Sequence, residues 1–167
     1  MGTSRLMNLT YERLNVRHTK EVIALCNTWW YDSAFFENTE MPFISKEVYW
    51  WNMFQAGIMM GIVGRNDEGE MKSCYVATRN SYMFNNNYQM ANEVVWCIDQ
   101  EYRSGRNLIQ LLNEIDACVK LNECNIYNLN LPLLENNDRL ISKLEDRGFF
   151  KQDISMLKTV KRENVDG

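Results

Sequence analysis

The sequence predicts an α+β domain built around one mixed β-sheet. Segments with the apolar spacing of amphipathic helices alternate with short segments that have the composition of strands. Two of these strands are separated by Asn66-Asp67-Glu68-Gly69, a tight turn typical of an antiparallel hairpin. The 167 residues are enough for one domain with a buried core and too few for two ordinary domains. We therefore expect a single domain over residues 1–160 and a polar C-terminal tail over residues 161–167.

The first half of the chain contains two predicted helices and three predicted strands. Apolar residues recur at helical spacing between residues 18 and 30 and again between residues 46 and 55. Ser45 directly precedes the second helix and is expected to be its N-cap. Between the two helices lies an irregular segment that is dense in aromatic residues. The predicted strands cover residues 8–14, 58–63 and 71–78, and the last two form the hairpin.

The second half alternates strand and helix. The turn Arg103-Ser104-Gly105-Arg106 follows a buried strand and opens a helix that is apolar on one face. A last helix is expected over residues 137–147, and Gly148 is its expected C′ residue. The predicted strands of this half cover residues 93–99, 126–131, 149–152 and 154–160.

The turn at residues 103–106 has the chemistry of an anion site. A Gly-containing turn that opens a helix points several free backbone N–H groups in one direction, and the helix dipole adds a partial positive charge there. Arg103 and Arg106 stand at its rim, where each would add charge-assisted hydrogen bonds of about 1.5–3 kcal/mol. These features predict a seat for a phosphate or pyrophosphate, and hence a phosphate-bearing cofactor.

Composition and charge exclude several classes of function. A net charge of −4 and a pI near 5.1 argue against broad nucleic-acid binding and suit a cationic acceptor such as an amine. The five cysteines are scattered without a Cys-x-x-Cys pair and the chain has one histidine, so no metal site is expected. We see neither a secretory leader nor an apolar span long enough for a membrane, and therefore expect a cytoplasmic protein with reduced thiols.

The segment Tyr102-Arg103-Ser104-Gly105-Arg106-Asn107-Leu108 is similar to the cofactor-binding motif of the GNAT superfamily of N-acetyltransferases. That motif is a strand, then Arg or Gln-x-x-Gly-x-Gly or Ala, then a helix. The present form resembles a Tyr-Arg-x-Gly-Arg variant of divergent members, including phage-encoded ones. Downstream, Asn137 begins a helix that is followed by Gly148-Phe149, which resembles a second feature of the superfamily. The resemblance covers the whole chain in the order of elements and residues 93–149 in motifs. It implies a mostly antiparallel central sheet flanked by about four helices.

The resemblance also implies that the chain transfers an acetyl group from acetyl-CoA to a primary amine of a small molecule or a protein. Backbone groups of Trp96, Cys97 and Ile98 would pair with the pantetheine arm of the cofactor, as an edge strand pairs with an extended peptide. The turn would hold the pyrophosphate, and Asn137 would contact the cofactor arm. The residues expected around the pyrophosphate are Arg103, Ser104, Gly105, Arg106, Asn107 and Leu108.

In such a reaction the amine must lose its proton before it attacks, which costs about 4.6 kcal/mol at pH 7 for a lysine-like amine. Glu93 resembles the glutamate that many members use as the general base, although a polar residue at the start of a strand needs no such role. Many members also place a tyrosine in the last helix, four residues before the glycine, to protonate the leaving thiolate. This chain has Leu144 there. Tyr127, Tyr88 or Tyr82 could replace that tyrosine, or the thiolate leaves without a dedicated acid.

A second interpretation is a GNAT-like protein without turnover that serves as a binding or assembly module, such as a phage structural or host-interacting protein. Leu144 and the irregular turn favour this interpretation, whereas Glu93, Arg103, Gly105 and Arg106 favour the enzyme. The role of the aromatic segment around residues 29–51 also has alternatives, which are weighted about equally. It borders the acceptor pocket in this fold, packs in the core or forms a protein-binding surface.

Overall fold

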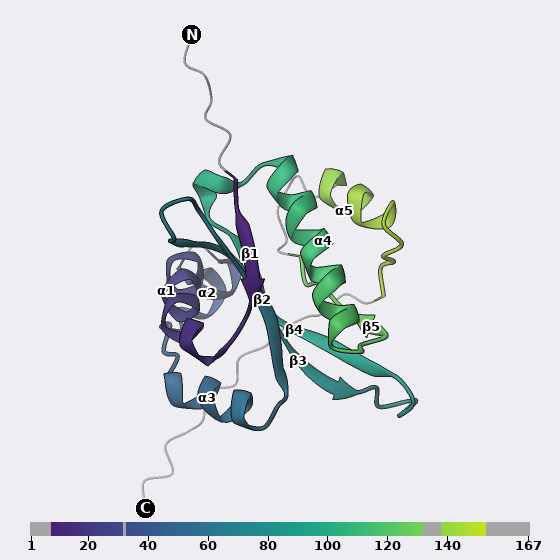
Figure 1. Ribbon diagram of the computed structural model, residues 1–167. Coiled ribbons are helices and arrows are strands. Elements are labelled where there is room, and N and C mark those ends of the chain that lie inside the picture. Colours follow the sequence, from purple (N-terminus) through teal and green to yellow (C-terminus); the bar gives the residue numbers. More distant parts are fainter. Residues whose placement is uncertain (1–7, 32, 132–137, 153–167) are drawn as a thin grey trace, which may run out of the picture.

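The computed structural model describes residues 8–31, 33–131 and 138–152, which form a five-stranded sheet with helices on both faces (Figure 1). The strands are β1 (Thr10–Arg13), β2 (Met59–Arg65), β3 (Met71–Ser81), β4 (Gln89–Ile98) and β5 (Ile126–Tyr127), in this spatial order. The pairings from β1 to β4 are antiparallel, and β4 pairs with β5 in parallel. The predicted α+β class with a mostly antiparallel sheet is therefore confirmed.

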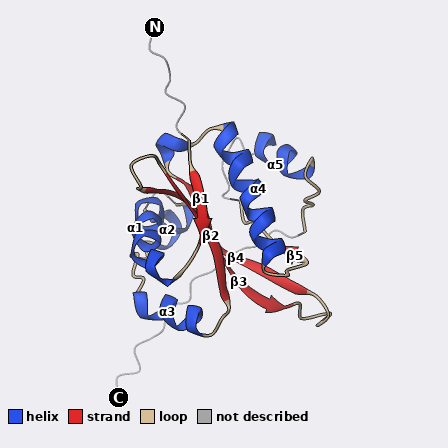
Figure 2. Cartoon of the chain, in the orientation of Figure 1, coloured by secondary structure: helices blue, strands red, loops and turns tan. Residues whose placement is uncertain are grey.

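The helices form two layers, one on each face of the sheet (Figure 2). They are α1 (Thr19–Trp30), α2 (Ala34–Thr39), α3 (Glu47–Gln55), α4 (Gly105–Leu121) and α5 (Asp138–Glu145), with short 3-10 helices at Val16–His18 and Gln100–Tyr102. One buried cluster joins α4 and α5 to one face of the sheet, and another joins α1 and α3 to the other face. Because side chains alternate along a strand, Tyr75 and Ala77 of β3 face α4, whereas Val76 faces α1.

The structure corrects several details of the sequence prediction. The described part of the chain holds five α-helices rather than about four, because α2 lies inside the segment expected to be irregular. Its N-cap is Ser33, whose Oγ accepts a hydrogen bond from the Phe36 N–H at 3.2 Å. Ser45 is not the N-cap of α3: that position is Lys46, and the Ser45 Oγ accepts from the Trp50 indole at 2.8 Å instead.

The strands differ most from prediction around the β3–β4 hairpin and after α4. β3 extends to Ser81 and β4 begins at Gln89, so the hairpin is longer than expected on both sides. β5 has two residues instead of six. In the described chain, residues 149–152 form no strand, while the expected strand over 154–160 and the tail over 161–167 lie outside the described residues. None of the helices described is long and apolar enough to cross a bilayer.

Candidate active site

A β-bulge in β4 sets the position of Glu93. Val95 pairs with Val76 and Glu93 pairs with Ala77, so Val94 is an extra residue in β4 without a partner in β3. Paired residues point to the same side of a sheet, and Ala77 faces α4. Glu93 therefore lies on the α4 side, next to the edge of β4 that faces β5.

β4 and β5 separate directly beyond their short pairing. Met90 pairs with Ile126 and Ala91 with Tyr127. Residues 93–96 of β4 and residues 128–130 are then connected through side chains, and we call this region the fork. The Glu93 N–H donates to Asn128 Oδ1 at 3.0 Å, the Asn130 N–H donates to the Glu93 carboxylate, and the Trp96 indole donates to the Asn130 carbonyl at 2.9 Å. A ligand could replace each of these hydrogen bonds without breaking any backbone–backbone hydrogen bond between paired strands.

The Glu93 carboxyl group is poised to exchange a proton near neutral pH. Burial disfavours its charged form and raises its pKa from 4.5 to about 7, with the hydrogen bonds from Asn130 acting in the opposite direction. A carboxylate with a pKa near the working pH is suited to general-base catalysis. Its location in the fork and its raised pKa favour a catalytic over a merely polar role.

The turn after β4 presents unpaired backbone donors at the N-terminus of α4. Ser104 is the N-cap, and its Oγ accepts from the Asn107 N–H at 3.1 Å. The Leu108 N–H donates to the Ser104 carbonyl at 3.0 Å and begins the helical ladder. Among the described residues, the N–H groups of Gly105 and Arg106 have no acceptor. These two donors are the candidate anion seat, at the positive end of the helix dipole.

A lysine that sequence reasoning missed lies over this seat. A Cβ placed on Gly105 would come 3.4 Å from Lys143 Nζ of α5. Within the described chain, Lys143 has no carboxylate at ion-pair distance. A cation beside the positive end of a helix is unfavourable unless an anion lies between them. No local sequence signal marks this residue, because its position depends on how α5 packs against α4.

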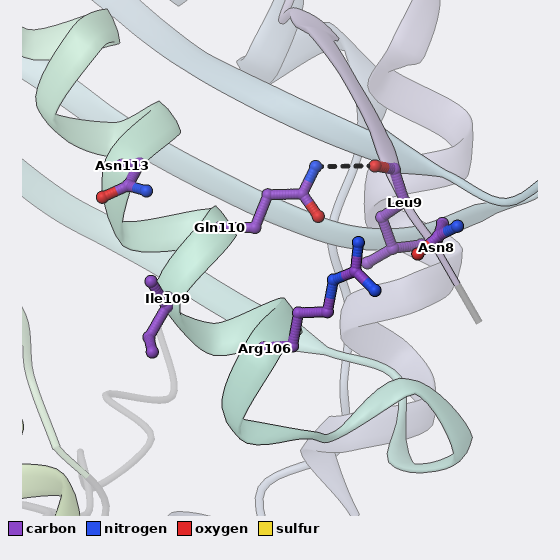
Figure 3. Close-up of a pocket in the computed structure, with 6 residues that line it drawn as sticks. All are labelled: Asn8, Leu9, Arg106, Ile109, Gln110 and Asn113. Atoms are coloured by element: carbon purple, nitrogen blue, oxygen red, sulfur yellow. Dashed lines mark hydrogen bonds between the residues drawn. The ribbon is translucent and has the colours of Figure 1, made fainter. Parts of the chain in front are cut away.

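The Arg106 guanidinium points toward Asn8 and Leu9, directly before β1. It lines a hollow of about 350 Å³ together with Asn8, Leu9, Ile109, Gln110 and Asn113 (Figure 3). Gln110 Nε2 donates to the Leu9 carbonyl at 2.8 Å and fixes one wall of this hollow. Arg106 thus contributes its backbone N–H to the anion seat and its side chain to the neighbouring surface.

The other side chains expected at the turn serve largely to hold its shape. Arg103 Nε donates to the Ile98 carbonyl at 3.0 Å. Asn107 is buried, and its Nδ2 donates to the Tyr102 carbonyl at 2.8 Å. Both interactions clamp the turn between β4 and α4, so these residues position the backbone donors of the seat.

The three expected pantetheine-binding residues of β4 differ in the direction of their backbone groups. The Asp99 N–H donates to Lys72 of β3, and the Cys97 carbonyl accepts from Ser73 Oγ at 3.0 Å. Because backbone groups alternate along a strand, those of Trp96 and Ile98 point to the opposite side, toward the fork. Asn137 lies outside the described residues.

Comparison with solved structures identifies the architecture. An aminoglycoside acetyltransferase from an uncultured soil metagenomic sample, in complex with sisomicin, superposes with a TM-score of 0.68 at 12% identity, covering 92% of this chain and 97% of that one. Glucosamine-6-phosphate N-acetyltransferase from Arabidopsis thaliana gives a TM-score of 0.67 at 11% identity, with 92% and 99% coverage. The ribosomal-protein-alanine N-acetyltransferase from Brucella melitensis gives 0.62 at 12%, with 93% and 100% coverage. The chain has the GNAT fold. No family model and no curated protein sequence matches it.

At the position where the resemblance to the GNAT superfamily places the acid, this chain has Leu144, a buried core residue of α5. Tyr127 is held by another partner: its hydroxyl donates to Asp116, and burial followed by that bond raises its pKa well above the usual value. Tyr82 and Tyr88 lie in the turn of the β3–β4 hairpin. Tyr88 precedes Glu93 by five residues, about 16 Å along an extended strand. None of these three tyrosines is placed as a replacement acid.

The aromatic segment before and within α3 divides between core and surface. Trp50 is buried, and Phe43 and Phe54 pack against the same cluster. Tyr49 and Trp51 are more than half exposed, and Trp51 lines a hollow of about 280 Å³ with Glu47. Among the residues that the structure describes, His, Cys, Asp and Glu form no group suited to a metal ion.

Proposed function

We propose that this protein is an acyl-CoA-dependent N-acetyltransferase that transfers an acetyl group from acetyl-CoA to a primary amine. The observation that carries the proposal is the pairing, within a GNAT fold, of a half-buried carboxylate beside a β-bulge in β4 with a candidate anion seat beyond the C-terminal end of the same strand. The similar solved structures named above are acetyltransferases of an aminoglycoside, of glucosamine-6-phosphate and of an alanine of a ribosomal protein. These compounds support an amine acceptor, from a small molecule or a protein.

The residues present fit the chemistry of acetyl-CoA. The N–H groups of Gly105 and Arg106 and the Lys143 ammonium group would hold the pyrophosphate. The backbone groups of Trp96 and the N–H of Ile98 face the side on which an extended amide-containing arm could pair, whereas the Ile98 carbonyl already accepts from Arg103. Bound acetyl-CoA supplies an activated thioester.

Glu93 supplies the base. Its carboxylate accepts the proton that the ammonium form of the acceptor must lose. The neutral nitrogen then forms a bond to the acetyl carbon as the carbon–sulfur bond breaks, and the second proton of the nitrogen goes to solvent. The electron pair of that bond remains on sulfur, and a thiolate with a pKa near 8.5 is a tolerable leaving group at neutral pH. The negative net charge of the chain favours a cationic amine as the acceptor. All five cysteines are buried and none forms a disulfide, which supports a reducing compartment such as the cytoplasm.

A thermal-shift titration with CoA and acetyl-CoA tests the cofactor site directly. At a hundred times the dissociation constant, binding adds about 2.7 kcal/mol and raises the melting temperature by roughly 5–11 °C for a domain of this size. A thiol-release screen over primary amines then tests transfer and identifies the acceptor. A melting temperature that stays constant up to millimolar CoA would refute the cofactor site and the proposed activity together.

The binding or assembly module is the second candidate, and a surface feature favours it. Exposed apolar side chains gather on and before α3 and at the tip of the β3–β4 hairpin: Ile44, Val48, Tyr49, Trp51, Met83 and Phe84. CoA binding without thiol release in the amine screen would favour this candidate over the enzyme.

A further inference from the structure

Tyr75 carries an unexplained polar atom in the core. The residue is fully buried in β3, and its hydroxyl has no hydrogen-bond partner among the described residues. Such an orphaned group is destabilising in the free protein and is rare in folded proteins. A buried donor of this kind points to a partner that arrives with a ligand.

The position of Tyr75 directs its hydroxyl to the fork. Tyr75 pairs with Trp96, and Ala77, two residues further along the same face, pairs with Glu93. Tyr75 and Glu93 are therefore diagonal cross-strand neighbours; such residues are about 7–8 Å apart, which is within reach of an aromatic side chain. The hydroxyl also lies within electrostatic range of Cys118 in α4 and Tyr127 in β5. It thus sits where α4, β4 and β5 meet.

The surroundings keep the Tyr75 hydroxyl protonated. Burial is the largest influence and raises the pKa far above its usual value, and the charges of Cys118 and Glu93 act in the same direction. A phenol of this kind is a poor proton donor to a thiolate, whose conjugate acid has a pKa near 8.5. It is a stable hydrogen-bond donor at every pH at which the protein would work.

We propose that the Tyr75 hydroxyl donates a hydrogen bond to the thiolate sulfur that leaves during acyl transfer; this inference rests on the proposed function. As the carbon–sulfur bond breaks, its electron pair goes to sulfur, and Tyr75 stabilises that charge while keeping its own proton. The amine proton goes to Glu93. Tyr75 and Leu144 belong to the same buried cluster, so the donor comes from the sheet beneath α5 rather than from α5 itself. The side-chain bonds that close the fork, above all that of Trp96 to Asn130, must open for the sulfur to reach Tyr75.

Tyr75→Phe is the decisive variant, and Tyr127→Phe is its matched control. Tyr75→Phe removes an unpartnered hydroxyl, so the free protein should melt at the same temperature as the parent or higher. Tyr127→Phe removes a hydroxyl that is bonded to Asp116 and should lower the melting temperature. A fall for Tyr75→Phe equal to that for Tyr127→Phe would mean that Tyr75 has a structural partner and would overturn the proposal.

The ionisation of bound CoA gives a readout that a structural role would not move. The ultraviolet absorbance of the thiolate, followed against pH in the protein–CoA complex, should show a thiol pKa about one to two units higher in Tyr75→Phe than in the parent. Tyr127→Phe should match the parent. With an acceptor in hand, Tyr75→Phe should lower kcat about 10²-fold.

The outcomes separate the two proposals. Equal thiol pKa values in the parent and in Tyr75→Phe, with CoA bound to both, would overturn the role of Tyr75 and leave the proposed function intact. A lower kcat with an unchanged thiol pKa would also overturn it, because the donor would then act on the acetyl oxygen instead. Absence of CoA binding to the parent would overturn both proposals.

Discussion

Glu93→Gln should change how the stability of the free protein depends on pH, before any acceptor is known. The pKa of the Glu93 carboxyl group is raised from 4.5 to about 7 by burial. Between these two values the unfolded chain releases this proton while the folded chain keeps it. The free energy of unfolding therefore falls by about 1.4 kcal/mol for each pH unit in this interval. The total loss above pH 7 is about 3 kcal/mol.

Gln has no charge to bury and keeps a carbonyl oxygen that accepts from the Asn130 N–H, so the variant escapes this loss. We expect Glu93→Gln and the parent to have equal stability near pH 4, and the variant to melt roughly 6–12 °C higher at pH 8. Differential scanning fluorimetry across this range measures the difference. Glu114→Gln, in α4, removes a carboxylate of the same size and should follow the parent at every pH. A stability gain for Glu93→Gln that does not vary between pH 4 and pH 8 would refute the burial argument.

Three further variants test the anion seat and the turn that supports it. Gly105→Glu should leave the fold intact, because the new side chain contacts only the flexible end of Lys143, and it should abolish the thermal shift with CoA, because it places a carboxylate in the seat. Isothermal titration calorimetry measures the loss of CoA binding, and tight CoA binding by this variant would disprove the seat. Lys143→Glu should weaken CoA binding by roughly 10–100-fold in the same assay, whereas Lys120→Glu at the other end of α4 should not change it. Equal CoA affinities of Lys143→Glu and the parent would show that Lys143 is not part of the site. Asn107→Ala should lower the free energy of unfolding, measured by urea denaturation, by about 1–3 kcal/mol, because it leaves the buried Tyr102 carbonyl without its donor. An unchanged urea midpoint would count against the role of Asn107 in holding the turn.

The parts of the fold that depend on local chemistry could be predicted from the sequence. Gly148 has a positive φ of 90° and its N–H donates to the Glu145 carbonyl, as expected of a residue that ends a helix. The Asn66–Gly69 turn and the opening of α4 at Gly105 also follow from residues within a few positions of each other. The spacing of residues is sufficient to predict a turn or a helix end when the residues that cause it lie in the same segment.

The parts that depend on pairing between distant segments could not be predicted. Residues 126–131 alternate like a strand, but the bulge at Val94 turns β4 away after Ala91, and only Ile126 and Tyr127 keep a partner. Ser45 has the composition of an N-cap, but the Trp50 indole uses its hydroxyl. The local preference was real in both cases, and a contact made elsewhere decided the outcome.

The same limit applies to the site. The resemblance of the sequence to a known motif pointed to Glu93 and Gly105, but not to the burial that raises the pKa of Glu93, which depends on the packing of residues 128–130 against β4. Tyr75 was simply part of the strand predicted over residues 71–78, and Lys143 part of the helix predicted over residues 137–147. Their significance arises only when β3 and α5 are placed beside the fork and the turn.

Three features of the free protein are unfavourable by themselves. Glu93 is a carboxyl group that resists ionisation, Tyr75 is a buried donor without an acceptor, and Lys143 is a cation at the positive end of a helix. An amine beside the first, a sulfur beside the second and a phosphate beside the third would relieve each of them, and an acyl-CoA with an amine acceptor supplies all three. If the proposed function is correct, substitutions that make the free chain more stable at Glu93 or Tyr75 should therefore slow acetyl transfer, because the stability given up in the free state is recovered only when cofactor and acceptor are bound.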